Sequence, residues 1–219
     1  MNPSNRALVV FSGGQDSTTC LLLARKEFGP AQVEALSFAY GQRHAIELER
    51  ARFICEQLGV PQTLLRLDSL GQITHNALMD AGAEIQMQGA LPNTFVAGRN
   101  ALFLLYAAIF ASERNLGTIY LGVSQTDYSG YPDCRDVFVK SMNVSLNLAL
   151  GRDFDVRTPL MYRTKKETWA LADELGGLEL VRDHSHSCYR GVAGGCHDCP
   201  SCRLREESLR DYLAERAGV

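Results

Sequence analysis

The chain has 219 residues, 46% of them hydrophobic and 21% charged, with a formal net charge of −3 at pH 7. This length suits one well-buried α/β domain with a small appendage and is short for two full catalytic domains. The negative charge argues against a large nucleic-acid footprint, and no stretch has the apolar length that a bilayer requires. Because no extended apolar signal region precedes the first predicted strand, we expect a cytoplasmic protein that binds a small molecule and neither nucleic acid nor membrane.

The most informative segment lies near the start of the chain. An apolar run at residues 7–11 predicts a buried strand, and residues 18–28 have the composition of a helix. Between them lies the turn Ser-Gly-Gly-Gln-Asp-Ser, residues 12–17. Its two glycines let the backbone approach a ligand closely, and Asp16 or Ser17 is expected to cap the helix. Since a helix N-terminus attracts anions, the turn is predicted to bind phosphate, the alternative being a tight capped turn without a ligand.

The elements that follow alternate between apolar strands and helices. Strands are predicted at residues 33–39, 62–67, 118–123 and 155–158, and helices at residues 43–58, 100–115, 133–150, 165–175 and 203–216. The alternation predicts a doubly wound parallel sheet, with a buried helix at 100–115 and an excursion at 69–92 that covers the site. Ligands of such sheets bind beyond the carboxyl ends of the strands, where the polar runs 41–44 and 122–127 should meet the glycine turn.

The composition changes abruptly at residue 183, which predicts a main domain at residues 1–182 and a cysteine-rich C-terminal subdomain at residues 183–219. The spacing C-x7-C-x2-C-x2-C is formed there by Cys188, Cys196, Cys199 and Cys202. Four thiolates at this spacing predict one structural zinc ion with no position left for water. The alternatives are a redox pair, an iron–sulfur cluster or unrelated buried thiols. The nearby His184, His186 and His197 are expected to face solvent or to lie outside the metal ligands.

Several segments together resemble one family. They are FSGGQDSTTCL (residues 11–21), YGQRH (40–44), PNTFVAGRN (92–100), GVSQTDYSGYPDCRD (122–136), TPLMY (158–162), KKETWALA (165–172) and the final cysteines. The turn has no Walker-type lysine, and it resembles that of the pyrophosphatase-loop (PP-loop) ATP enzymes, whose fold is like that of adenine-nucleotide α-hydrolases. As a set, the segments are similar to the 7-cyano-7-deazaguanine synthases of the queuosine-precursor pathway. The likeness covers nearly the whole chain and is weakest at residues 69–91.

This resemblance implies an ATP-dependent carbon–nitrogen ligase, in a homodimer, that converts 7-carboxy-7-deazaguanine and ammonia into 7-cyano-7-deazaguanine (preQ0). The carboxylate and then the amide would be adenylated, and the turn would hold the departing pyrophosphate, so AMP and not ADP is the expected nucleotide product. A Mg²⁺ ion is expected to bridge the phosphates near Asp16. ATP is expected to be bound by the first segment: Phe11, Ser12, Gly13, Gly14, Gln15, Asp16, Ser17, Thr18, Thr19, Cys20 and Leu21.

The same resemblance implies roles for residues elsewhere. The expected catalytic residues are Lys165, Arg99, Asp127 and Asp133, whereas Lys166 has no matching role. The expected substrate contacts are Gln42, Arg43, Asn100, Tyr128, Tyr131 and Arg135. Carboxylates would accept hydrogen bonds from the edge of the deazaguanine, and tyrosines would stack on its flat face. The alternatives are a solvated helix surface for the lysines, a cap with a surface charge for Arg99 and Asn100, and a cap of the helix beginning there for Asp133.

Two rival functions are compatible with parts of the sequence. A tRNA-thiolating PP-loop enzyme would share the turn, but it needs a sulfur-carrying cysteine, for which Cys134 is the one residue near the substrate edge. A zinc-ribbon binding module without catalysis would leave the glycine turn unexplained. Ammonia would come from solution or from a partner, since the chain has no apparent glutaminase domain.

Overall fold

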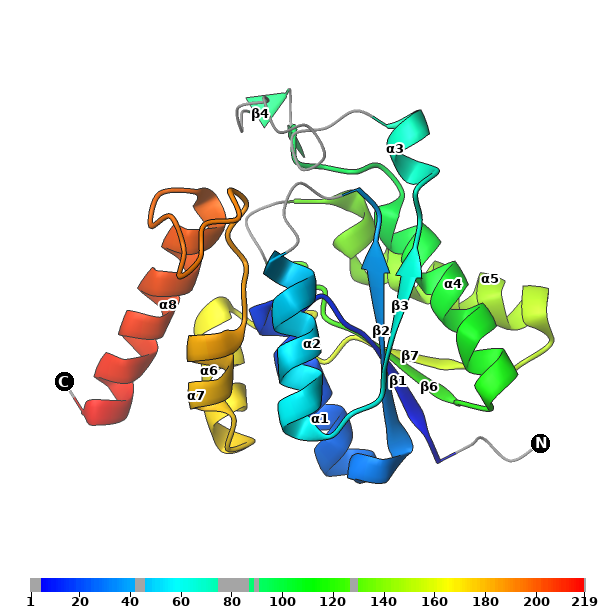
Figure 1. The fold of residues 1–219 in the computed structure, drawn as a ribbon, viewed down its shortest axis with the longest axis horizontal. Coiled ribbons are helices and arrows are strands. Elements are labelled where there is room, and N and C mark those ends of the chain that lie inside the picture. The colour runs from blue at the N-terminus through cyan, green and yellow to red at the C-terminus, as the bar shows by residue number, and fades with distance from the viewer. Residues whose placement is uncertain (1–4, 42–45, 75–86, 89–90, 127–129, 219) are drawn as a thin grey trace.

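The computed structural model describes residues 5–41, 46–74, 87–88, 91–126 and 130–218. Its centre is a five-stranded sheet of order β3-β2-β1-β6-β7, in which every neighbouring pair is parallel (Figure 1). The strands are β1 (Ala7–Val10), β2 (Val33–Ala39), β3 (Gln62–Arg66), β6 (Thr118–Leu121) and β7 (Asp155–Arg157). The strand order reverses between β1 and β6, so the carboxyl ends of these two strands frame the crevice where doubly wound folds bind ligands.

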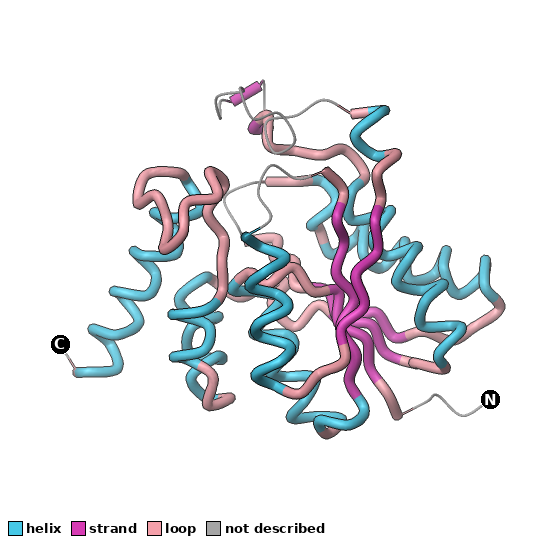
Figure 2. The backbone as a smooth tube through the Cα atoms, viewed as in Figure 1, coloured by secondary structure: helices cyan, strands magenta, loops and turns pink. Residues whose placement is uncertain are grey.

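Helices cover both faces of the sheet, which explains why β1 is apolar at every position (Figure 2). On one face, α4 (Arg99–Arg114) and α5 (Asp136–Leu150) pack with Leu8 and Val10 of β1. On the other face, α1 (Gln15–Phe28) and α2 (Ile46–Leu58) pack with Ala7 and Val9. The doubly wound parallel sheet predicted from the sequence is therefore confirmed.

The last three helices form a group beside α1. They are α6 (Lys165–Glu174), α7 (Leu178–His184) and α8 (Pro200–Ala217). Trp169 of α6 is fully buried among these helices and donates its indole N–H to the Ser208 hydroxyl of α8 at 3.2 Å. The boundary expected after residue 182 falls inside α7, and the division into two units stays a prediction.

The remaining elements are short, and only η1 lies at the amino end of a strand, directly before β2. Turn η1 spans Pro30–Gln32 and η2 spans Pro132–Cys134. The excursion after β3 holds α3 (Leu70–Ile73) and an antiparallel pair of β4 (Met87–Gln88) with β5 (Leu91–Pro92). Among the helices of the described ranges, none is long and apolar enough to cross a membrane.

Three local expectations are corrected by the structure. Helix α1 begins at Gln15 and is capped by Gly14 without a side-chain bond, so the prediction that Asp16 or Ser17 caps it is wrong. Both residues lie in its first turn instead. Helix α4 is not buried all round, because Leu105 and Ile109 are 40% and 43% exposed on its outer face. The helix expected from residue 133 is split into turn η2 and α5, which begins at Asp136.

Candidate active site and metal centre

The glycine turn lies at the carboxyl end of β1 and fits closely between its neighbours. Gly13 has a φ of +79°, which favours glycine, and a Cβ there would lie 2.7 Å from the Ala51 nitrogen and 2.8 Å from the Glu47 carbonyl oxygen. A Cβ on Gly122, just after β6, would lie 3.0 Å from the Ser17 nitrogen. The turn is thus fixed by backbone contacts on two sides, and only glycine fits at Gly13.

Hydroxyl groups hold the turn from within. Ser17 Oγ accepts from the Ser12 N–H at 3.2 Å and shares a 3.0 Å hydrogen bond with Ser12 Oγ. Thr18 Oγ1 donates to the Gly14 carbonyl at 2.7 Å. The start of α1 has no side-chain cap, so its first amides are suited to an anion such as a phosphate group.

The remaining residues of the predicted ATP segment support the turn from behind. Phe11, Cys20 and Leu21 are at most 1% exposed and belong to the apolar core between the sheet and α1. Thr19 is also fully buried and donates its hydroxyl to the Gln15 carbonyl at 2.9 Å. These four residues therefore support the glycine turn and the first turn of α1, and contact of the 11–21 segment with ATP stays a prediction.

Two adjacent lysines have opposite surroundings. Lys165 is 13% exposed and its Nζ lies 2.5 Å from Asp16 Oδ2, so it reaches the glycine turn from the start of α6. A capping box between Thr164 and Glu167 fixes that start. Lys166 is 45% exposed and pairs with Glu215 on α8 at 2.6 Å. The structure thus brings Lys165, and not Lys166, to the turn.

The two carboxylate oxygens of Asp16 have different surroundings: Oδ2 pairs with the Lys165 ammonium, whereas Oδ1 is buried. Within the described ranges, this second oxygen, Oδ1, has no hydrogen-bond partner, and neither does the buried Nε2 of the adjacent Gln15. Buried polar atoms of this kind are uncommon in folded proteins and call for an explanation. A carboxylate oxygen in this position suits a hard cation such as Mg²⁺.

A charged cluster follows β2 and meets the start of α4. Arg99 Nη1 donates to the Tyr40 hydroxyl at 3.2 Å, and its guanidinium lies 5.8 Å from the centre of the Tyr40 ring. Burial raises the pKa of Glu47 to about 7, although the Arg99 guanidinium acts to lower it. The sequence predicts a role for Arg99 but none for Tyr40 or Glu47, which lie on either side of the polar run 41–44.

Asp133 and Asn100 join the start of α4 to turn η2. Asp133 is 6% exposed, and its Oδ2 accepts from the Asn100 N–H at 3.1 Å. The Asn100 amide donates in turn to the Asp133 carbonyl at 3.1 Å and to Cys134 Sγ at 3.5 Å. Asp133 therefore caps α4 and not the helix that follows it in sequence, which corrects the alternative considered for this residue.

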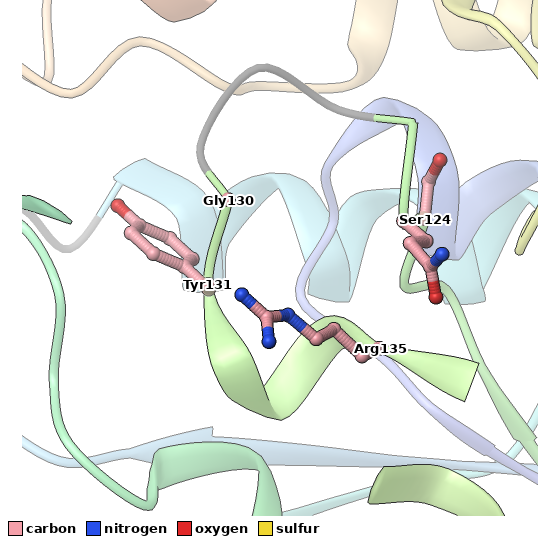
Figure 3. A pocket seen from close by; sticks show the side chains of 5 residues that line it. Ser124, Gly130, Tyr131 and Arg135 are labelled. Atoms are coloured by element: carbon pink, nitrogen blue, oxygen red, sulfur yellow. The ribbon is translucent and has the colours of Figure 1, made fainter. Parts of the chain in front are cut away.

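A cavity of about 170 Å³ opens beside this junction (Figure 3). Its lining residues come from two segments: Ser124, Gln125, Gly130, Tyr131 and Arg135. The Tyr131 hydroxyl shares a 2.7 Å hydrogen bond with Thr94 Oγ1, and its ring packs on Phe95 with centroids 5.2 Å apart. Gln125 Oε1 accepts from the Asp136 N–H at 3.1 Å, which fixes the start of α5. The predicted contacts Tyr131 and Arg135 thus share one cavity.

Four predicted residues belong to the two segments 42–45 and 127–129. Gln42 and Arg43, expected to contact the substrate, lie outside the described residues. Asp127, expected to be catalytic, and Tyr128, expected to contact the substrate, lie outside them as well. The roles of these four residues stay predictions.

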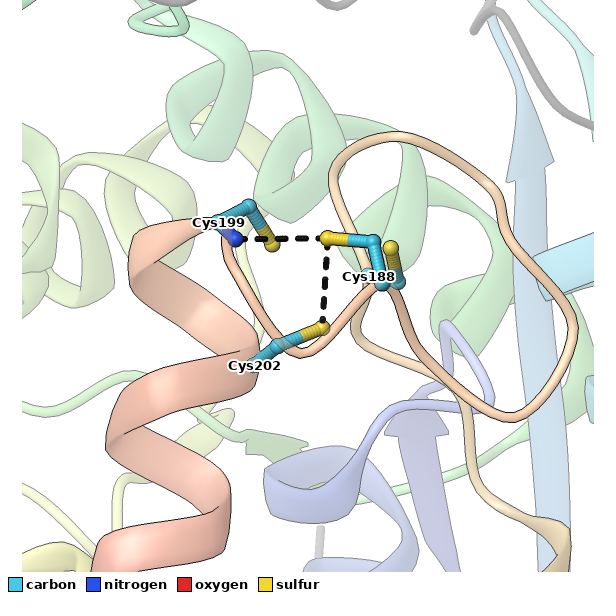
Figure 4. A group of neighbouring side chains, drawn as sticks. Cys188, Cys199 and Cys202 are labelled. Atoms are coloured by element: carbon cyan, nitrogen blue, oxygen red, sulfur yellow. Dashed lines mark hydrogen bonds between the residues drawn. The ribbon is translucent and has the colours of Figure 1, made fainter.

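The four cysteines of the C-terminal segment converge (Figure 4). Their sulfur atoms all lie within 4.8 Å of one another, and Cys188, Cys199 and Cys202 are at most 4% exposed. Cys196 Sγ accepts from the Cys199 N–H at 3.2 Å. Burial opposes ionisation, but the N–H groups of Cys199 and Asp198 lower the pKa of Cys196 to about 6. This group of thiols can bind a metal ion.

The three nearby histidines have different environments. His197 is 70% exposed and pairs with Glu206, as expected for a solvent-facing residue. His184 packs on Phe53 with ring centroids 4.7 Å apart. His186 does not face solvent: it is 6% exposed, and its backbone N–H donates to the Gly13 carbonyl at 2.9 Å. The C-terminal segment therefore touches the glycine turn, a contact that no local sequence signal indicates.

A parallel doubly wound sheet with a glycine turn of this form, a lysine at the turn and no Walker-type lysine defines the class of PP-loop enzymes that use ATP. A family model for the queuosine biosynthesis protein QueC matches residues 6–213. The chain therefore belongs to the QueC family of 7-cyano-7-deazaguanine synthases, which act in queuosine biosynthesis. The family resemblance noted from the sequence is confirmed.

Solved structures with similar folds include two synthetases. NMN synthetase from Francisella tularensis superimposes with a TM-score of 0.56 at 16% identity, over 97% of this chain and 78% of that one. NH3-dependent NAD synthetase from Campylobacter jejuni gives a TM-score of 0.51 at 14% identity, over 97% and 87%. The U34-tRNA thiolase NcsA from Methanococcus maripaludis gives 0.48 at 15% identity, over 96% and 67%. At these identities the first two show a shared fold, and the third supports no conclusion.

Proposed function

We propose that the chain is an ATP-dependent carbon–nitrogen ligase that makes 7-cyano-7-deazaguanine by two adenylations at one site. The observation that carries this proposal is the glycine turn with the Lys165–Asp16 pair at its rim. A carboxylate is a poor electrophile, so one oxygen must first become a leaving group. Its attack on the α-phosphorus of ATP breaks the bond to the β-phosphate and gives an acyl-adenylate and pyrophosphate.

The chain's own groups stabilise the charge that develops in this step. The first backbone N–H groups of α1 would bind the departing pyrophosphate, since they lie at the positive end of the helix dipole. The Lys165 ammonium would leave Asp16 for the phosphate oxygens or bridge both. Positioning of this kind, without a covalent enzyme intermediate, accounts for most of the catalysis in phosphoryl and nucleotidyl transfer.

The second half of the reaction replaces oxygen by nitrogen. Ammonia attacks the acyl carbon, and AMP leaves with its electron pair as one proton is lost, giving the amide. The amide oxygen then attacks the α-phosphorus of a second ATP and releases a second pyrophosphate. Loss of AMP with its electron pair, together with both protons of the nitrogen, gives the nitrile. Glu47, whose pKa burial raises to about 7, is suited to accept protons near the turn at neutral pH.

Two metal ions fit the residues present. Mg²⁺ would be held by the buried Asp16 oxygen that has no hydrogen-bond partner among the described residues, and it would neutralise phosphate charge. Zinc would be held by the four converging thiols, which leave no ligand position open and therefore favour a structural role.

The acid would occupy the cavity next to the turn. Arg135 offers a guanidinium for its carboxylate, and Tyr131 offers a ring edge for its flat bicycle. The exposed Leu105 and Ile109 on α4, with Val144 and Leu148 on α5, give a surface suited to the homodimer that the family implies.

The test is incubation of the purified chain with 7-carboxy-7-deazaguanine, ammonium and ATP, followed by mass spectrometry and nucleotide analysis. We expect the nitrile, with two AMP formed for each nitrile and no requirement for tRNA or a sulfur donor. ADP as the sole nucleotide product would overturn the adenylation mechanism. Turnover only with tRNA and a sulfur donor would favour the rival thiolation reaction.

A further inference from the structure

The stretch between α7 and Cys188 lies directly on the glycine turn. The His186 N–H donates to the Gly13 carbonyl at 2.9 Å, and a Cβ on Gly14 would lie 3.4 Å from the His186 carbonyl oxygen. Both glycines belong to the turn that is proposed to hold pyrophosphate. The position of residues 185–187 therefore affects the shape of the nucleotide site, although these residues are more than 160 positions away in sequence.

A single arginine of α8 holds this stretch in place. Arg205 Nη1 donates to Ser185 Oγ at 2.9 Å and to Ser187 Oγ at 3.2 Å, one on each side of His186. Its Nη2 donates to the carbonyls of Val181 at 2.8 Å and Arg182 at 3.0 Å, at the end of α7. The planar guanidinium thus bridges four acceptors, which a lysine could not do.

The surroundings of Arg205 connect it to both the turn and the helix core. Its guanidinium lies 5.1 Å from the centre of the buried Trp169 ring. Burial lowers the pKa of Arg205, whereas the negative charge of Asp16 raises it. The Arg205 cation on α8 and the Asp16 carboxylate of the glycine turn therefore attract one another electrostatically.

The four cysteines include one residue close to Arg205 on α8 and one close to the 185–187 stretch. Cys202 precedes Arg205 by one turn of α8, and Cys188 follows His186 by two residues. A metal ion bound by the thiols would fix the start of α8 and the end of the 185–187 stretch relative to one another. Arg205 is then presented to its four acceptors by an anchored helix.

We propose that Arg205 is a positioning residue of the ATP site, which holds residues 185–187 against Gly13 and so couples the four-cysteine centre to nucleotide affinity. The inference rests on the proposed function to the extent that the turn binds the phosphates of ATP. It predicts that nucleotide binding depends on α8, a member of the C-terminal group of helices.

The experiment compares full-length Arg205→Met and Arg205→Lys with the wild type. Arg203→Met is the matched control, because Arg203 lies on the same helix, is 62% exposed and pairs only with Asp198 in the described contacts. The measurements are metal content, binding of a non-hydrolysable ATP analogue by calorimetry, KM for ATP and for the acid, and hydrogen exchange of peptides covering 12–18 and 184–188.

For Arg205→Met we expect a normal metal content, nucleotide binding weaker by about 10- to 100-fold, and faster exchange in both peptides. KM for ATP should rise while KM for the acid stays unchanged. Arg205→Lys keeps the positive charge but can make fewer of the hydrogen bonds, so its nucleotide affinity should lie between those of the wild type and Arg205→Met. Arg203→Met should behave as the wild type. Removing the metal from the wild type with a chelator should reproduce the exchange pattern and the weaker binding.

Several outcomes would overturn the inference. If Arg205→Met binds the analogue as the wild type does and its 12–18 peptide exchanges normally, Arg205 serves only the packing of α7 and α8. If Arg205→Met does not fold, the decision passes to Arg205→Lys, where an unchanged KM for ATP together with slow exchange rejects the coupling. A wild-type chain that fails to bind the analogue would instead reject the proposed function, so the two failures are distinguishable.

Discussion

The nucleotide region and the substrate region of this chain are built in different ways. The glycine turn comes from one continuous segment, and its shape depends on backbone contacts such as those of Gly13 with Ala51. The cavity beside it is lined by side chains from two segments, and its walls are tied to a third through Thr94. A site formed by the backbone of one segment can be predicted from the local sequence, whereas a site formed by side chains of several segments depends on how those segments pack together.

The strongest way to break the nucleotide region is Gly13→Ala. A positive φ costs a non-glycine residue roughly 1–2 kcal/mol, and the Cβ would overlap backbone at 2.7 Å, where nothing flexible can give way. We expect loss of measurable ATP binding by calorimetry and a lower melting temperature. Gly151→Ala, at a φ of +60° with open space around its Cβ, is the control and should lose about 1 kcal/mol without losing ATP binding. Normal ATP binding by Gly13→Ala would show that the turn is not the phosphate site.

The pair of adjacent lysines sharpens the same region. Lys165→Met removes the cation beside Asp16, and we expect kcat to fall by about 10²- to 10³-fold, as for loss of a charge-stabilising donor. Lys166→Met removes only an exposed pair with Glu215 and should change kcat by less than about twofold. Steady-state assays of nitrile formation compare the two. Equal losses of kcat in both variants would mean that the Lys165 ammonium has no specific role in catalysis.

The substrate region should respond to Arg135→Met in a different parameter. Loss of a charged donor to the acid's carboxylate is expected to raise KM for the acid by about 10- to 100-fold and to leave KM for ATP unchanged. Lys140→Met, one turn further along α5 and paired with Asp136 at 2.6 Å, is the matched control. A rise in KM for ATP would contradict the separation of the two regions.

Glu47 lies where the two regions meet, and its substitution is expected to show in the pH dependence of stability. Its pKa is raised from an ordinary 4.5 to about 7, so between these values the unfolded chain loses the proton while the folded chain keeps it. The wild-type free energy of unfolding therefore falls as pH rises through this window. Glu47→Gln should be more stable than the wild type by up to about 3 kcal/mol at pH 8 and no more stable at pH 4, in urea titrations.

The control for this pH dependence is Glu56→Gln on the same helix, where the carboxylate is 64% exposed and pairs with Arg52. Its stability should differ little from the wild type at either pH, because exposed ion pairs contribute little. A Glu47→Gln stability gain that does not change between pH 4 and pH 8 would show that burial of the charge is not its cause.

The sequence predicted the sheet, the glycine turn and the four-cysteine group because each depends on local patterns. Apolar runs mark β1 and β2, and the short cysteine spacing brings Cys196, Cys199 and Cys202 together without help from the fold. Helix α7 was missed, since a seven-residue helix gives little periodicity. Its position nevertheless decides where the His186 N–H points.

Other contacts escaped prediction because they join distant elements. The Asp133 carboxylate caps α4, which begins at Arg99, 34 residues earlier in the chain. Proximity in sequence therefore suggested the wrong helix. Arg205 is one of several charged residues on α8, and it differs from them in having four acceptors on α7 and the 185–187 stretch. The residues around Asp133 predict a role for it but not which helix it caps, whereas those around Arg205 do not distinguish it from an ordinary surface charge.

The burial of Trp169 gives the chain a built-in optical probe. It is the single tryptophan, and its indole lies between α6 and α8 with the Ser208 hydroxyl at its N–H and a guanidinium over its ring. Emission from such an enclosed indole is blue-shifted, and it moves to longer wavelength when water reaches the ring. Intrinsic fluorescence therefore reports directly on whether the C-terminal helix is seated, without any label and at the concentrations used for kinetics.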